Sequence, residues 1–488
     1  MMTMNSGTKL KSFLLKVTEY ILSEGWMYLL LMAGLYFIYK MLFKVPPPML
    51  IALGILPIFI CLLILLITHT TKGFYALYSI QFLLVMGGMI MEIKMGVTTL
   101  ILTLFIFTLV IIRNIYEHVS WQKSCNGMLI LYAIWGVFCI IQIVNPNNVQ
   151  EAWNIAITHY LVYPMICAIL VPLAIKDIKG IEWLLIIWSI FIIIASGKGY
   201  WQKTYGFNEK ELYFLYVLGQ AKTHIIWSGI RYFSCFSDAA NFGVHMAMAI
   251  PVFGISLFYV KSYWMKIYFF MIVLIALYGM GISGTRAAVA VPIGAIGFYI
   301  LLSRNAKVTV IGVVVLLATF SFFQFTDIGN GNQYIRKMRS AFNPTEDASY
   351  QLRVHNRARM KELMKYKPIG YGQGLAKADR FHPKERMPYP PDSWLVAVWV
   401  ENGIIGATLY ILVHAVLFAW CSWILIFKIM NKRLRGLLAA WLCMAAGFFV
   451  AAYANDVMQY PNSIIIYTAF ALCFAGIYID KQIRKGTE

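Results

Sequence analysis

Long apolar runs, separated by short polar connections, recur along the whole chain of 488 residues. Runs of roughly 17 to 25 apolar residues have the length that an α-helix needs to cross a bilayer. The composition agrees, because 60% of the residues are hydrophobic and only 13% are charged, against roughly a quarter charged in soluble proteins. The pattern predicts an all-α polytopic membrane protein. It excludes a soluble enzyme, a disordered protein, a disulfide-stapled secreted domain and a β-barrel.

Run length predicts about twelve to fourteen membrane-spanning helices, the lower numbers applying if two short runs form one broken or re-entrant helix. The predicted spans are 21–43, 48–68, 74–92, 96–112, 127–145, 153–175, 181–197, 239–260, 264–283, 286–302, 307–324, 403–428, 436–454 and 462–480.

The charge of the connections predicts the orientation. The chain has 41 Lys and Arg against 21 Asp and Glu, and the short connections on one side are all basic, which is typical of cytoplasmic loops. Both termini are therefore expected in the cytoplasm, with the first helix retained, and nucleic acid is not expected as a partner. The predicted organisation is 1–324 with an outer loop at about 198–238, a large outer loop at 325–391, and C-terminal helices at 392–488.

The large outer loop carries more positive charge than its location explains. It has thirteen basic and six acidic residues, a net charge of +7, on the side that the positive-inside rule does not favour. Long loops cross the membrane despite such charge, so the topology stands. The excess points to an anionic partner.

Two features of this loop are candidates for binding that partner. The stretch 349–368 reads as an amphipathic helix with Arg353, Arg357 and Lys361 on one face, which is either a solvated basic face or a surface for phosphates. The following PIGYGQG, with Gly370, Gly372 and Gly374, predicts a tight turn with accessible N–H groups that could bind an anion. It is not a nucleotide-binding P-loop, because no Gly-Lys-Ser/Thr follows.

Two arginines, Arg231 and Arg286, lie at predicted membrane boundaries on the same outer face. Arginine there either snorkels to headgroups or faces a polar cavity. It is also suited to bidentate phosphate recognition. The convergence of both arginines with the basic loop on one face favours an anion-binding site.

The candidate acid–base residues follow the loop. Asp392 and Ser393 are placed to cap a helix, with a short helix expected before the membrane span proper. Glu401 lies in apolar surroundings, either as a structural partner of an arginine or as a functional carboxylate. His382 is the loop histidine nearest to Asp392 in sequence. No HxxxH or HExxH spacing occurs, so no metal site is expected, and the eight cysteines are interpreted as core residues.

These fragments form an ordered set that resembles the O-antigen ligase and O-antigen polymerase superfamily of bacterial membrane glycosyltransferases. The matching pieces, around a large late outer loop, are Arg231 with Phe236, Asp238 and Asn241; Ser283-Gly284-Thr285-Arg286-Ala287; Arg353 followed by Pro368-x-Gly370-x-Gly372-x-Gly374; and Glu401-x-Gly403-x-x-Gly406.

The resemblance implies a GT-C-like helical fold in the bacterial inner membrane and a site that faces the periplasm. It implies a glycan donor linked to undecaprenyl diphosphate, and an acceptor that is a lipid A–core sugar for ligases or another glycan repeat unit for polymerases. It implies no cofactor, no nucleotide sugar and, for ligases, no metal. The residues matching Arg231 and Arg286 are implied to bind the diphosphate.

One position departs from the family pattern. Ligases carry a histidine nine residues before the glutamate, and this chain has Asp392 there. Asp392 could act as the general base, His382 could replace it, or the position could orient the acceptor. Ligase is slightly favoured over polymerase. A lipid-linked glycan flippase is the alternative from another class, disfavoured because paired repeats of broken helices are absent from the sequence.

Overall fold

A computed structural model describes residues 70–91, 119–226, 229–303, 305–340, 342, 348–376 and 381–486, with scattered positions among 12–36 and 101–114. Within these residues the regular secondary structure is almost entirely helical. The predicted spans 21–43, 48–68 and 96–112 lie wholly or largely outside them.

Nine stretches of the described residues are helical, long and apolar enough to cross a membrane, which confirms an all-α polytopic membrane protein. They are Gly127–Val144 (α5 Gly127–Ile141 and η2 Gln142–Val144), Gln150–Ala174 (α6 Gln150–Ile157, η3 Thr158–Val162 and α7 Tyr163–Ala174), α8 Ile178–Tyr205, α11 Ala239–Ser256, α12 Tyr263–Ile282, α14 Ala306–Phe325, Trp394–Lys428 (α17 Trp394–Trp423 and η7 Ile424–Lys428), α18 Lys432–Ala454 and α19 Asn462–Lys485.

Further elements complete the described chain. They are α3 Thr70–Met91, η1 Trp121–Lys123, α9 Glu209–Leu212, η4 Tyr213–Val217, α10 Ala221–His224, the strands β1 Ile225–Ile226 and β2 Gly229–Ile230, η5 Arg286–Val289, α13 Ala290–Leu302, α15 Gln333–Arg339 and α16 Ala348–Met364. The two strands pair as an antiparallel hairpin.

Most helix ends fall within a few residues of the predicted ones, because a local signal marks them. Helix α11 begins at Ala239, where Asp238 accepts a hydrogen bond from the backbone N–H of Asn241 at 2.8 Å. The predicted end of α8 at residue 197 is wrong. The helix continues through eight more residues to Tyr205 and ends at Gly206, whose φ is +88°, because a helix does not stop where its sequence stops being apolar.

The centre of the bundle is formed by α11, α18 and α19, whose side chains are mostly buried by other helices. Helix α18 packs closely on α13, and a Cβ at Gly447 would overlap the Val291 carbonyl. Small residues are what let membrane helices approach so closely. Helix α14, by contrast, buries no residue and lies at the periphery.

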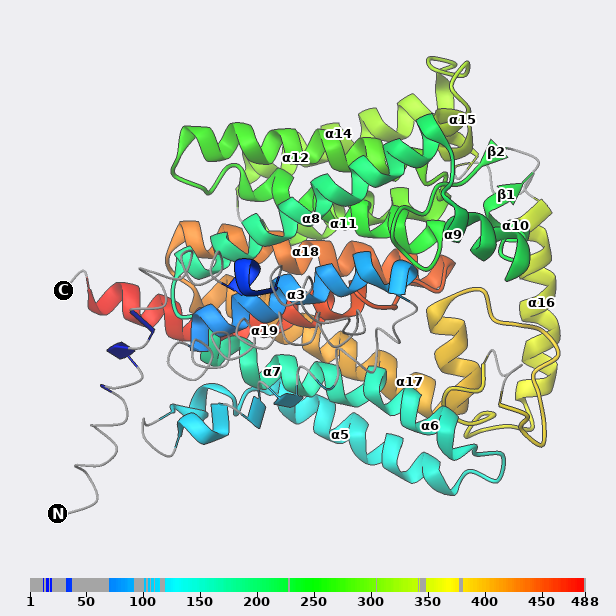
Figure 1. Ribbon diagram of the computed structural model, residues 1–488, viewed down its shortest axis with the longest axis horizontal. Helices are drawn as coiled ribbons and strands as arrows, with labels where there is room; N and C mark the ends of the chain where they lie inside the picture. Colours follow the sequence, from blue (N-terminus) through cyan, green and yellow to red (C-terminus); the bar gives the residue numbers. More distant parts are fainter. Residues whose placement is uncertain are drawn as a thin grey trace.

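The elements of the two predicted outer loops gather at one end of the bundle. Helices α9, α10, α15 and α16 and the hairpin lie there, while the C-terminal end of α19 lies at the opposite end (Figure 1). Two loops that are far apart in sequence therefore meet over one set of helix ends.

Candidate functional site

The turn between α12 and η5 connects both candidate arginines to the first turn of α11. Thr285 donates its hydroxyl hydrogen bond to the Ala239 carbonyl at 2.9 Å and accepts one from Arg231 Nη2 at 3.0 Å. Arg286 is the next residue and starts η5. The structure therefore brings Arg231 and Arg286 together at the N-terminal end of α11, where the helix dipole adds positive potential.

Arg231 is partly buried, and its guanidinium retains unused donor capacity. Nη1 donates to the Thr223 carbonyl at 3.2 Å, and Nε is buried without a hydrogen-bond partner among the described residues. Burial lowers the pKa of Arg231; Asp238 opposes this shift, while Arg286 and Arg353 add to it. The guanidinium stays charged, so positive charge is concentrated here beyond what the local carboxylate balances.

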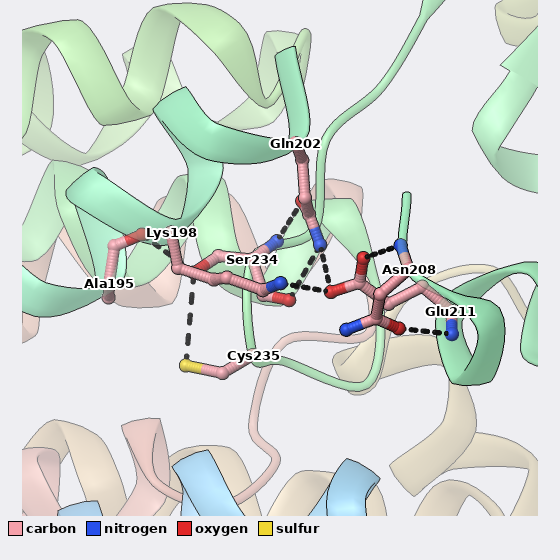
Figure 2. A network of polar contacts seen from close by, with 7 residues as sticks. All are labelled: Ala195, Lys198, Gln202, Asn208, Glu211, Ser234 and Cys235. Carbon is pink, nitrogen blue, oxygen red and sulfur yellow. Dashed lines mark hydrogen bonds and ion pairs between the residues drawn. The ribbon is translucent and has the colours of Figure 1, made fainter. Parts of the chain in front are cut away.

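A polar network beneath the surface fixes the segment that carries Arg231. The Gln202 side chain exchanges two hydrogen bonds with the Ser234 backbone, at 2.8 and 2.9 Å, and donates to Glu211 at 3.0 Å. Lys198 pairs with the same buried carboxylate at 2.8 Å (Figure 2). Ser234 has a φ of +56°, a conformation that costs of order 1–3 kcal/mol for a residue with a side chain. The network holds this turn three residues after Arg231.

Lys337 of α15 joins the two arginines, although the sequence marked it only as one basic loop residue among thirteen. Its side chain is buried, and its Nζ donates to the Gly229 carbonyl at 3.4 Å. Burial, followed by the charges of Arg231 and Arg286, lowers its pKa from 10.5 to about 8. The basic cluster, defined as Arg231, Arg286 and Lys337, thus draws on both outer loops and on the turn between α12 and η5.

The predicted amphipathic helix forms as α16, but its arginines have partners. Arg353 Nη1 donates to the Ala454 carbonyl at 2.9 Å and Arg357 Nη2 to the Tyr453 carbonyl at 3.1 Å. These carbonyls end α18, and cations are stabilising at the C-terminal end of a helix. Binding of the donor by these two arginines stays a prediction.

Asp392 lies beside this helix end. Its Oδ2 is 3.6 Å from Arg353 Nε, and its side chain is 46% exposed, so solvent or an acceptor can reach it. The cap of α17 is the neighbouring Ser393, which accepts from the Val396 N–H at 3.3 Å. Exposed His382 has a φ of +46° in the same loop. Neither residue's catalytic role is tested by the geometry.

The glycine turn directs its N–H groups to α17. Tyr371 and Gly372 donate to the carbonyls of Val400 and Glu401, at 2.9 and 3.0 Å. Gly370, Gly372 and Gly374 all have positive φ. A Cβ at Gly370 would overlap the Glu401 carbonyl, so only glycine allows this approach. The predicted nest is therefore filled by the chain itself and not left open for a diphosphate.

Glu401 faces this turn as a buried carboxylate. It accepts from the Tyr160 hydroxyl at 2.8 Å and from the Ala376 N–H at 3.3 Å, so its structural partners are a tyrosine and backbone, not the expected arginine. Helix α17 is interrupted at Gly403, whose φ is +67°. This interruption gives the short helix that was predicted ahead of the membrane helix.

Asn145 and Asn147, in the connection between α5 and α6, also hold the turn, and no local sequence signal indicates this role. Asn147 Nδ2 donates to the Tyr371 carbonyl at 2.7 Å, and Asn145 Nδ2 to the Gly370 carbonyl at 3.3 Å. The partners are more than two hundred residues apart. Asn-Pro-Asn-Asn reads locally as an ordinary loop.

Residues 271–411 match the family model for O-antigen ligase. The matched segment runs from α12 through Arg286, Lys337, α16 and the glycine turn into α17. The match covers less than half of the chain, and over this segment the chain is similar to the O-antigen ligase family. The resemblance found in the sequence is confirmed, and the chain is a multi-pass membrane protein of the O-antigen ligase or polymerase type. Arg231 lies outside the matched segment. No curated protein matches the chain.

Proposed function

We propose that this protein is a member of the O-antigen ligase superfamily and a glycosyltransferase of the bacterial inner membrane. It moves a glycan from an undecaprenyl diphosphate carrier to a lipid A–core acceptor, as a ligase. The observation that carries the proposal is the basic cluster, which gathers fixed cations at one end of the bundle. A site that stabilises a departing diphosphate needs such preorganised charge.

The proposed reaction is a single displacement at the anomeric carbon. The acceptor hydroxyl oxygen forms the new bond to this carbon while the bond to the carrier diphosphate breaks. The diphosphate leaves with the bonding electron pair, and Arg231 and Arg286 balance its growing charge. Asp392 takes the proton of the acceptor hydroxyl, and Arg353, 3.6 Å away, holds the Asp392 carboxylate in place.

The proposed orientation puts both termini in the cytoplasm and the cluster at the periplasmic face. The short basic connections of the sequence support it. The gathering of both long loops at the end of the bundle opposite the end of α19 agrees with it (Figure 1).

A second candidate activity is polymerisation of surface polysaccharide, in which the acceptor is another repeat unit. Asp392 favours it, because it stands where ligases carry a histidine. The donor chemistry and the basic cluster would be the same, and only the acceptor would differ.

Mass analysis of lipid-linked glycans in a strain lacking this protein separates the two. Long polymer left on the carrier, with bare acceptor, is expected for a ligase. Single repeat units accumulate if the protein is a polymerase. The comparison is repeated in a strain that also lacks related enzymes, with and without the gene. A pool that is the same in both cases contradicts both transferase proposals.

A further inference from the structure

Lys337 is a buried cation without a buried counter-charge. Only 8% of the residue is exposed, and among the described residues no carboxylate lies within ion-pair distance of it. Its one hydrogen bond goes to the Gly229 carbonyl at 3.4 Å, which is too long to be strong. Burying a charge is unfavourable unless it is paired, so this arrangement needs an explanation.

The surroundings of Lys337 make the arrangement less favourable still. If Gly284 carried a Cβ, that atom would lie 3.4 Å from Lys337 Nζ and 3.4 Å from Arg231 Cγ. Gly284 is two residues before Arg286, and its φ is +59°. The Lys337 ammonium group and the Arg231 side chain therefore lie against one glycine turn. The charges of Arg231 and Arg286 both act unfavourably on the Lys337 ammonium.

We infer that Lys337 Nζ binds the diphosphate together with Arg231 and Arg286, as a third cation of the donor site. This inference rests on the proposed function and adds to it a ligand from the large outer loop. The three cations come from three segments, namely the loop after β2, the start of η5, and α15. A diphosphate bound beside these residues would supply the negative charge that Lys337 lacks.

A purely structural role for Lys337 makes a different prediction. If the bond to Gly229 were its purpose, removing the side chain would destabilise the unliganded protein. If Lys337 is a ligand, removing it relieves repulsion, and the unliganded protein keeps or gains stability, as is common for residues kept for binding. The lowered pKa of this amine, which results from burial and from its two cationic neighbours, agrees with the second expectation.

The test measures binding of geranyl diphosphate to the purified full chain in detergent, with geraniol, inorganic pyrophosphate and phosphatidylglycerol as further probes. The variants are Lys337→Gln, Lys337→Arg, Arg286→Ala and a matched control, Lys365→Gln. The Lys365 side chain is 56% exposed and pairs with nearby Glu362. Unliganded thermal stability is measured for every variant.

For Lys337→Gln we expect binding weakened about tenfold or more, since a charged hydrogen bond is lost, with unliganded stability unchanged or higher. Lys337→Arg should retain most of the affinity, and Lys365→Gln should match the wild type. Competition by pyrophosphate but not by geraniol supports recognition of the diphosphate.

Unchanged binding in Lys337→Gln, with Arg286→Ala still weakened, overturns the role of Lys337 and leaves the proposed function intact. Unchanged binding in both variants overturns the diphosphate site altogether. A fall in unliganded stability of Lys337→Gln that Lys337→Arg restores without restoring affinity shows a structural role. Displacement of geranyl diphosphate by phosphatidylglycerol shows a lipid-headgroup site instead.

Discussion

Two groups of basic residues lie at the same end of the bundle, and they differ in what they contact. Arg353 and Arg357 donate to the last carbonyls of α18, so a helix end already supplies their negative charge. In the basic cluster, Arg231 and Lys337 lie against Gly284, and neither of them forms an ion pair within the described residues. The comparison teaches that an excess of arginine does not by itself indicate where an anion binds. Positive charge that no group of the protein balances is the better indicator.

The sharpest way to break this comparison is to remove one cation from the cluster. Arg286→Ala and Arg231→Ala should each lower transfer about a hundredfold or more, as expected for a fixed donor at a site of developing charge, with normal protein abundance in the membrane. The measurement is glycan transfer in vivo beside quantitative immunoblotting. Retained activity in both variants contradicts a diphosphate clamp.

The next largest effect is expected for Asp392, the carboxylate beside Arg353. Asp392→Asn should lower transfer on the order of a hundredfold, the usual contribution of a general base, because the amide cannot take the acceptor proton. Donor binding should not change, which geranyl diphosphate titration checks. Full activity of this variant would contradict Asp392 as the general base. His382 would then be the candidate base, and His382→Ala tests it in the same assay.

The pH dependence of donor binding gives a smaller effect of defined sign. The pKa of Lys337 is lowered to about 8, so the amine is charged below pH 8 and neutral above it. Affinity for geranyl diphosphate should therefore fall as pH rises, about tenfold between pH 7 and pH 9 if one proton is needed. Of the facing groups, Arg231 and Arg286 stay charged, and the lowered pKa of His224 keeps it neutral throughout. An equally steep fall in affinity with pH in Lys337→Arg would show that another group causes the pH dependence.

The smallest effect is expected where the helix end supplies the counter-charge. Arg357→Ala should cost about 0.5–1 kcal/mol of stability, the typical worth of a cation at a helix C-terminus, with transfer reduced less than about threefold. Thermal unfolding measures the change in stability, and the transfer assay measures the change in activity. A loss as large as that of Arg286→Ala would return Arg357 to the donor site and erase the difference between the two groups.

The sequence predicted the helices well and their partners poorly, for a physical reason. Apolar run length and a local cap such as Asp238 mark where α11 begins, and both are read within a few positions. The contacts that decide charge are distant along the chain: Glu401 meets Tyr160 of η3, and Lys337 meets Gly229 of β2. Nothing within a short window shows these encounters.

The glycine turn also shows what a local sequence can and cannot predict. Its conformation was predictable, because Gly370, Gly372 and Gly374 permit positive φ and all three adopt it. Its use was not predictable, because the N–H groups of Tyr371 and Gly372 are bonded to α17. A local sequence reveals available donors, but only the packed structure reveals which of them are already occupied.

The gathering of three cations in the basic cluster also bears on how the proposed reaction would end. Breaking the glycosyl bond leaves the carrier with one more negative charge than the donor had, so a fixed set of cations retains the spent carrier more strongly than it binds the incoming one. Turnover would then be limited by product release, as in many enzymes. Weakening a cation slightly could speed the cycle at saturating donor even while it lowers affinity.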